Sequence, residues 1–144
     1  MEYTIEKISD LKCLVDYLND VNDDFGIPLS TKTPIASFAN KLLSFGNVFA
    51  IKLNNEVVSC IGFYCNDVIN YTAYFTILST RNVARGKGFA RLLTNKMLEE
   101  CKKNKMRKIL CDSINPHAIA LYKSVGFIEY KKDGNKIFLE YNIK

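Results

Sequence analysis

The most informative stretch of the chain is Arg85-Gly86-Lys87-Gly88-Phe89-Ala90, where two glycines separate a segment of strand character from one of helix character. Residues 71–80 are rich in β-branched and aromatic side chains, and residues 89–104 repeat apolar side chains at helical spacing. Glycine lets a ligand approach the backbone, and a helix N-terminus attracts anions. The stretch predicts either a plain turn or an anion site, with Arg85 and Lys87 adding positive charge at its rim.

A second informative stretch is Asn115-Pro116-His117-Ala118-Ile119-Ala120-Leu121-Tyr122-Lys123-Ser124-Val125-Gly126-Phe127. Asparagine followed by proline predicts a helix start, and Gly126 predicts the helix end. The apolar face of this helix includes Tyr122, which is either a core aromatic or a hydroxyl presented to a ligand. Asn115 is likewise either an ordinary N-cap or a ligand contact.

Periodicity on both sides of these stretches predicts the order β-α-α-β-β-β-α-β-α-β-β. The expected strands are 3–8, 48–53, 57–64, 71–80, 108–111, 127–130 and 136–141, and the expected helices follow residue 10 and span 35–46, 89–104 and 116–126. Residues 19–34 are predicted to form a loop because Asn, Asp, Gly, Pro, Ser and Thr dominate them. The second, third and fourth strands are expected to form an antiparallel meander.

Length and composition limit the classes of protein to which the chain can belong. The chain has 144 residues, 48% of them hydrophobic and 24% charged, which predicts one globular domain over residues 1–144. The apolar runs are too short for a membrane span, and the N-terminus lacks the pattern of a secretory signal, so we expect a cytoplasmic protein without membrane association. The net charge is +5, with acids concentrated in residues 1–30 and bases in residues 81–110. An anion loop and a helix end account for these bases, so we expect no nucleic-acid partner.

The chain contains five cysteines and one histidine, the residue types that most often form metal sites. Cys13, Cys60, Cys65, Cys101 and Cys111 are scattered, without a C-x-x-C pair. They are expected to act as small buried hydrophobes rather than as a metal site or a disulfide framework, and a nucleophilic cysteine is the alternative.

Together the two stretches resemble the GNAT superfamily of N-acetyltransferases. Its cofactor loop reads [RQ]-x-x-G-x-[GA], which Arg85, Gly88 and Ala90 match. Its later helix reads N-x-x-A-x-x-L-Y-x-x-x-G-F, which matches here at Asn115, Ala118, Leu121, Tyr122, Gly126 and Phe127. The resemblance covers essentially the whole chain. It implies an α/β (α+β) fold with a mixed central sheet of about seven strands, in which the fourth and fifth strands splay apart.

The resemblance also implies that acetyl-CoA lies in the splay. Its expected contacts are the end of the fourth strand, the glycine stretch and the later helix, namely Leu78, Ser79, Thr80, Arg85, Gly86, Lys87, Gly88, Phe89, Ala90, Asn115, Ala118 and Tyr122. A strand amide near Leu78 would hold the oxyanion, and Tyr122 would protonate the leaving thiolate as general acid. The amine would attack the thioester directly, without a covalent enzyme intermediate.

The general base is left unassigned, because residues 71–80 contain no acid. The candidates are Asp23, Asp24, Asp112 and His117, and desolvation or water is the alternative.

The acceptor is expected to be a primary amine of a small molecule, such as an amino sugar, a polyamine or an amino-acid-like compound. Its site is predicted at Asp23, Asp24, Phe25 and Tyr74, although Phe25 and Leu29 are equally compatible with a loop anchored in the core. A protein or peptide amine, or a non-catalytic acyl-CoA-binding domain, are the alternatives. The chain is expected to be a monomer or a homodimer.

Overall fold

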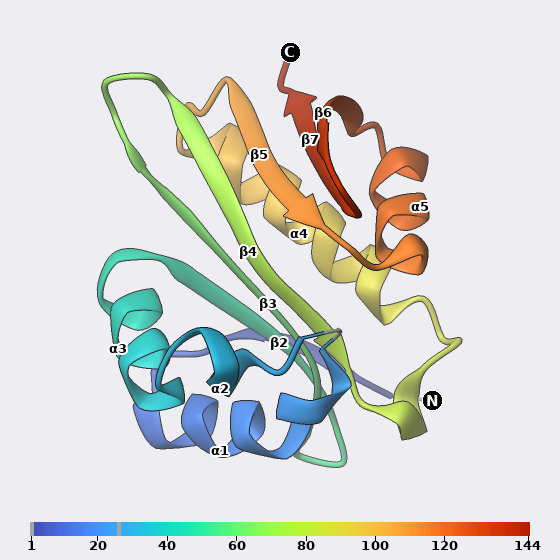
Figure 1. The fold of residues 1–144 in the computed structure, drawn as a ribbon. Helices are drawn as coiled ribbons and strands as arrows, with labels where there is room; N and C mark the ends of the chain where they lie inside the picture. The colour runs from blue at the N-terminus through green and yellow to red at the C-terminus, as the bar shows by residue number, and fades with distance from the viewer. Residues whose placement is uncertain (1, 26) are drawn as a thin grey trace.

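A computed structural model describes residues 2–25 and 27–144, which fold into one sheet flanked by helices (Figure 1). In chain order the elements are β1 (Thr4–Lys7), α1 (Leu11–Val21), the 3-10 turn η1 (Asn22–Asp24), α2 (Leu29–Lys32), α3 (Ile35–Phe45), β2 (Asn47–Leu53), β3 (Glu56–Asp67), β4 (Thr72–Thr80), the 3-10 turn η2 (Asn82–Ala84), α4 (Phe89–Lys103), β5 (Lys108–Ser113), α5 (Pro116–Ser124), β6 (Ile128–Asp133) and β7 (Lys136–Asn142). No helix in the described ranges has the length and apolar character needed to cross a membrane.

The sheet has seven strands in the order β1-β2-β3-β4-β5-β7-β6. Neighbouring strands from β1 to β4 are antiparallel, which confirms the predicted meander. The β4–β5 pair is parallel, and β5, β7 and β6 are again antiparallel. The sheet is therefore mixed, as the resemblance implies.

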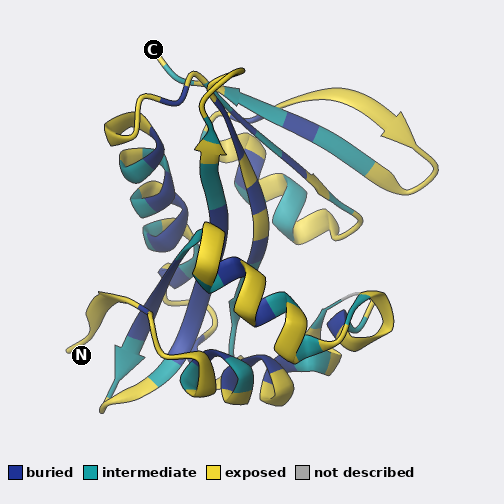
Figure 2. Cartoon of the chain, turned by 90° about the vertical axis from the view of Figure 1, so that its left-hand side faces the viewer, coloured by how far each residue is buried: buried dark blue, intermediate teal, exposed yellow. Residues whose placement is uncertain are grey.

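Alternation along β2 builds a hydrophobic core on each face of the sheet. Phe49 and Ile51 pack into the core covered by α4, whereas Val48 and Ala50 pack into the core covered by α1 and α3. Side chains point alternately to opposite faces of a strand, so a nearly continuous apolar run serves both cores. Figure 2 shows the buried centre of the sheet, the exposed outer faces of the helices and the exposed β6–β7 hairpin.

A bulge in β4 interrupts this alternation. Gly62 is paired with Ile77 and Phe63 with Phe75, so Thr76 is an extra residue on β4. As a result Phe75 faces the α4 core and Ile77 faces the opposite one. Strand β4 pairs with β5 only from Thr72 to Tyr74, and beyond that point the two strands diverge. This divergence is the implied splay.

Side chains cap two helix starts, one at Asp10 and one at the predicted position Asn115. The Asp10 carboxylate accepts hydrogen bonds from the N–H groups of Lys12 and Cys13 at 2.9 and 3.4 Å. The Asn115 side-chain oxygen accepts them from His117 and Ala118 at 2.9 and 3.4 Å. Each side chain satisfies N–H groups that the helix itself cannot pair.

The prediction of a plain loop over residues 19–34 is wrong at residues 19–24 and 29–32, which are helical, and Gly26 lies beyond the described residues. Helix α1 continues to Val21 because that side chain is buried in the core. The Asn22 side chain then bonds both the N–H and the hydroxyl of Ser30, at 2.9 and 2.8 Å, which ties η1 to α2. Leu29 anchors α2 because it is buried in the core. Tertiary burial thus overrides a composition typical of loops.

Candidate active site

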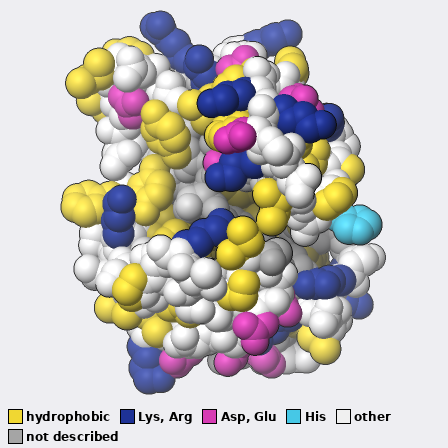
Figure 3. Space-filling view, viewed as in Figure 1, with side chains coloured by type: hydrophobic (Ala, Val, Ile, Leu, Met, Phe, Trp, Pro, Cys, Tyr) yellow, Lys and Arg dark blue, Asp and Glu magenta, His cyan; other side chains and the backbone are white. Residues whose placement is uncertain are grey.

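The divergence of β4 from β5 creates a cleft of about 720 Å³. The end of β4 lines one side, and the end of β5 with the start of α5 lines the other. The turn before α4 and the residues around α2 line the remainder. Figure 3 shows a surface hollowed near the middle of the face that carries α1 and α3.

The N-terminus of α4 supplies free backbone donors to this cleft. Gly86 and Gly88 have φ angles of +78° and +81°, and nothing lies within 4 Å of a Cβ built on either one. The N–H of Leu92 donates to the Gly88 carbonyl at 3.0 Å and begins the helical pattern. The preceding N–H groups, from Phe89 to Arg91, have no acceptor inside the helix. Such a helix end is suited to an anion, and both glycines leave it open.

Arg85 joins this loop to the end of β4. Its Nε donates to the carbonyl of Thr80 at 3.1 Å, and Arg85 also lines the cleft. The side chain is held at the strand end with guanidinium nitrogens remaining to bind an anion. This position is suited to a phosphate at the rim of the cleft.

Tyr122 extends from α5 and lines the cleft. Its ring packs edge-on against Phe75 with centroids 5.1 Å apart, and the residue is 6% exposed. Within the described ranges, every fully buried side-chain oxygen or nitrogen has a hydrogen-bond partner. The Tyr122 hydroxyl has no such partner, so this oxygen is not fully buried and is accessible from the cleft that Tyr122 lines. Burial raises the pKa of Tyr122, so the hydroxyl keeps its proton at neutral pH.

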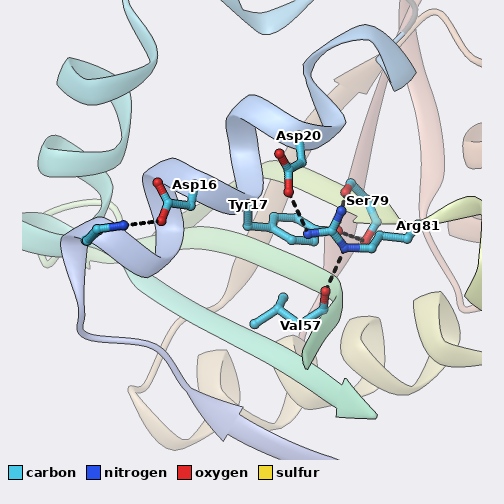
Figure 4. Close-up of polar contacts among 7 residues, drawn as sticks. Asp16, Tyr17, Asp20, Val57, Ser79 and Arg81 are labelled. Carbon is cyan, nitrogen blue, oxygen red and sulfur yellow. Dashed lines mark hydrogen bonds and ion pairs between the residues drawn. The ribbon is translucent and has the colours of Figure 1, made fainter. Parts of the chain in front are cut away.

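Side-chain hydrogen bonds from α1 and β3 fix the end of β4, and Figure 4 shows the one from Tyr17 on α1. The hydroxyls of Tyr17 and Ser79 lie 2.7 Å apart, and the Ser59 hydroxyl donates to the Ser79 carbonyl at 3.0 Å. Arg81 lies 4.8 Å from the Tyr17 ring centroid and donates to the Val57 carbonyl at 2.8 Å. The hydroxyl and the carbonyl of Ser79 are therefore both hydrogen-bonded within the protein. Ser79 also lines the cleft.

Two carboxylates and the histidine also line the cleft. Asp24 comes from η1, and Asp112 stands on β5, two residues beyond the last pairing of β5 with β4. His117 lies in the first turn of α5. Of the four base candidates, Asp23 alone is not part of the described lining.

The structure brings most of the predicted site residues together. The cleft is lined by Asp24, Phe25, Leu78, Ser79, Thr80, Arg85, Gly86, Gly88, Phe89, Ala90, Asn115, Ala118 and Tyr122. Among the described residues, Lys87, Asp23 and Tyr74 do not line it. Phe25 and Leu29 both line the cleft and pack on the core, so anchoring in the core does not remove this segment from the cleft wall.

Sequence reasoning missed several further lining residues, including Lys32, Thr76, Arg91, Ile114 and Leu121. Thr76 lies at the bulge, which leaves no mark in the alternation of residue types. Arg91 was detectable, because it lies in the first turn of the helix that follows the glycine stretch. In the described part of the chain no cluster of three or more His, Cys, Asp or Glu is placed to hold a metal ion.

Comparison with known proteins gives one family and many structural neighbours. Residues 14–127 match the acetyltransferase (GNAT) family. A GNAT-family acetyltransferase from Staphylococcus aureus Mu50 superposes with a TM-score of 0.81 at 17% identity, covering 99% of this chain and 100% of that one. The ribosomal-protein-S18-alanine N-acetyltransferase of Escherichia coli gives 0.79 at 17% identity, with 99% and 95% covered.

A third neighbour is the PaiA N-acetyltransferase of Thermoplasma acidophilum, whose structure contains coenzyme A. Its TM-score is 0.78 at 16% identity, with 99% of both chains covered. No curated protein matches the sequence. At these identities the structural likeness establishes the fold, and the match over residues 14–127 establishes the family.

Proposed function

Because the chain belongs to the GNAT family of acetyltransferases, we propose that it transfers an acetyl group from acetyl-CoA to a primary amine of a small molecule in the cleft between β4 and β5. One observation carries the proposal: the free amides at the start of α4 and the protonated hydroxyl of Tyr122 line the same cleft. The first group suits a diphosphate and the second suits a leaving thiolate.

Acetyl-CoA fits the donors that the cleft offers. Its diphosphate would accept hydrogen bonds from the backbone between Gly86 and Ala90, with Arg85 adding a charge-assisted bond. The pantetheine arm would lie along Leu78 to Thr80, because β4 has no β5 partner there. Asn115 and Ala118 would contact it from the start of α5.

The leaving thiolate would take its proton from Tyr122. Burial against Phe75 keeps the hydroxyl protonated and leaves it facing the cleft. The amine nitrogen attacks the thioester carbon and the carbon–sulfur bond breaks. A β4 amide near Leu78 would stabilise the oxyanion. The phenolic proton passes to sulfur, and no enzyme-bound acetyl group forms.

Asp112 is the carboxylate that we assign to the incoming ammonium. It lies where β4 and β5 begin to separate, and it is exposed to the cleft. An alkylammonium has a pKa of about 10.4 and must lose a proton before it attacks. A carboxylate at this point attracts the cation and accepts that proton, directly or through water.

The part of the cleft near η1 and α2 is suited to a small amine with an apolar body. Residues around η1 and α2 wall the cleft with one acid and several apolar groups: Asp24, Phe25, Ile27 and Leu29. Lys32 lies beside them and adds a positive charge. An amino sugar, a polyamine or an amino-acid-like compound presents the matching amine.

Thermal unfolding with acetyl-CoA, CoA and NAD added separately tests the cofactor assignment. A ligand that binds only the native state raises its stability, so the two CoA species should raise Tm and NAD should not. Thiol release is then measured with panels of small amines and of peptides. Absence of any shift with CoA species would overturn the proposal, and turnover with peptides alone would move the acceptor to the protein class.

A further inference from the structure

Two of the five cysteines lie against each other although 36 residues separate them in the chain. The sulfur of Cys65 on β3 is 3.3 Å from the sulfur of Cys101 on α4. We propose that Cys65 and Cys101 form a dithiol site that reacts with low-molecular-weight disulfides and closes into an intramolecular disulfide. Neither residue lines the cleft in the described structure, so this inference is independent of the proposed function.

The two thiols differ in access, which gives each one a separate role. Cys65 is half-buried, whereas Cys101 is fully buried in the α4 core. A reagent from solvent therefore reaches Cys65 first, and the buried Cys101 is the thiol that can react with the product formed on Cys65. The hydrogen bond from Cys101 lowers the pKa of Cys65, and that bond together with burial raises the pKa of Cys101. Cys65 is thus the attacking group, because the thiolate is the nucleophile.

The small disulfide is the oxidant, so the reaction balances without a metal or a further oxidant. The Cys65 thiolate attacks one sulfur of the small disulfide and releases one thiol, leaving a mixed disulfide on Cys65. Cys101 then loses its proton, attacks the Cys65 sulfur and releases the second thiol. Overall, two protein thiols become one protein disulfide, and one small disulfide becomes two small thiols.

Formation of the disulfide requires a small movement of the two cysteines. A disulfide has an S–S distance of about 2.05 Å, so the sulfurs must approach each other further. Cys65 lies in an irregular stretch of the β3–β4 ladder, where the register shifts between Tyr64 and Asp67. Cys65 has no partner on β4 in this register, so fewer ladder hydrogen bonds hold its backbone in place. Cys101 stands near the C-terminal end of α4, which ends at Lys103.

The other cysteines lack this arrangement. Cys60 and Cys111 are buried, and burial raises the pKa of each thiol to about 12, which holds them protonated. Cys13 is half-exposed on α1. No further sulfur–sulfur contact appears among the described residues. Cys13, Cys60 and Cys111 therefore serve as internal controls for selective reaction at Cys65 and Cys101.

The test treats the folded wild-type protein with oxidised glutathione, blocks remaining thiols and maps peptides by mass spectrometry. The expected product has lost two hydrogens and links the tryptic peptide 97–102 to the peptide 53–81. Chymotryptic cleavage after Phe63 or Tyr64 then separates Cys60 from Cys65 and identifies the linked residue. Retention of free thiols at both Cys65 and Cys101 while Cys13 is modified would overturn the proposal.

Two single variants test the order of the steps. Cys101→Ser should accumulate one glutathione on Cys65, because no second thiol resolves the mixed disulfide. Cys65→Ser should leave Cys101 unmodified, because it is buried. Cys13→Ser is the matched control and should form the same 65–101 link as the wild type. Equal modification of Cys101 in the presence and absence of Cys65 would contradict the assigned order.

Discussion

The hydroxyl of Tyr17 lies 2.7 Å from the hydroxyl of Ser79, joining α1 to the end of β4 across 62 residues of sequence. Tyr17 is 3% exposed and its ring lies under the Arg81 guanidinium, so few other positions are open to it. Burial raises the pKa of Tyr17, which keeps its proton available for the hydrogen bond at neutral pH. Helix α1 thereby supports the strand along which the pantetheine arm is proposed to lie.

Tyr17→Phe should weaken acetyl-CoA binding through this support. A buried hydrogen bond contributes about 1 kcal/mol, so we expect a comparable loss in the free energy of unfolding. If the bond also positions Ser79, the Kd for acetyl-CoA should rise about fivefold. Urea unfolding and calorimetric titration measure the two effects.

Tyr130→Phe is the matched control, because Tyr130 is 49% exposed on β6 and is not part of the described cleft lining. It should change neither quantity. A Tyr17→Phe variant that loses stability but binds acetyl-CoA as the wild type does would restrict Tyr17 to a structural role.

Gly88→Ala should weaken acetyl-CoA binding more than it destabilises the fold. The φ of +81° strains any L side chain by about 1 kcal/mol. The added methyl would also stand at the open helix N-terminus, so we expect the Kd for acetyl-CoA to rise about tenfold or more. Gly134→Ala matches the strain, because Gly134 has a φ of +59° and open space around it in the β6–β7 turn. Equal effects of both variants on acetyl-CoA affinity would refute a phosphate site at Gly88.

The order of elements was predictable apart from α2, whereas the contacts between distant elements were not. Helix and strand periodicity, the Asn115 cap and the positive-φ glycines are local features, so they are visible in the sequence. The bulge at Thr76 depends on strand register, which local patterning does not specify.

The same limit applies to the side-chain contacts. The Tyr17–Ser79 and Cys65–Cys101 contacts depend on how α1 and α4 pack on the sheet. The family motifs therefore located the cleft walls formed by the glycine turn and α5, whereas on the wall around α2 only Asp24 and Phe25 were predicted.

Tyr122→Phe should lower kcat while leaving acetyl-CoA affinity nearly unchanged. The ring contacts with Phe75 and Phe127 remain, and only the hydroxyl that donates the proton is lost. Loss of a general acid typically costs about 10²-fold or more in rate. Steady-state kinetics and calorimetric titration separate the two effects. A variant with wild-type kcat would show that Tyr122 serves the core alone.

Asp112→Asn should lower kcat/KM for the amine by about 10²-fold, because the variant can neither attract the ammonium nor accept its proton. Asp112→Glu should restore part of the rate, since it retains a carboxylate near the same point. Asp133→Asn, in the exposed β6–β7 hairpin, is the control for removing one surface charge. If Asp24→Asn reduces the rate and Asp112→Asn does not, the base lies on η1 instead.

The free energy of unfolding should decrease as the pH rises above about 9, because buried thiols, Cys60 and Cys111 among them, then keep their protons only in the folded state. Burial raises the pKa of Cys60 and of Cys111 from 9.0 to about 12. Between these values the unfolded chain has lost protons that the folded chain retains, so stability falls by about 1.4 kcal/mol per pH unit for each thiol. Their contribution is complete below pH 9 and disappears as the pH approaches 12. Urea unfolding from pH 8 to 10.5 measures the slope, which Cys60→Ala should reduce by one thiol's share even though the cavity lowers stability at every pH. An unchanged slope in Cys60→Ala would show that this thiol already ionises in the folded protein.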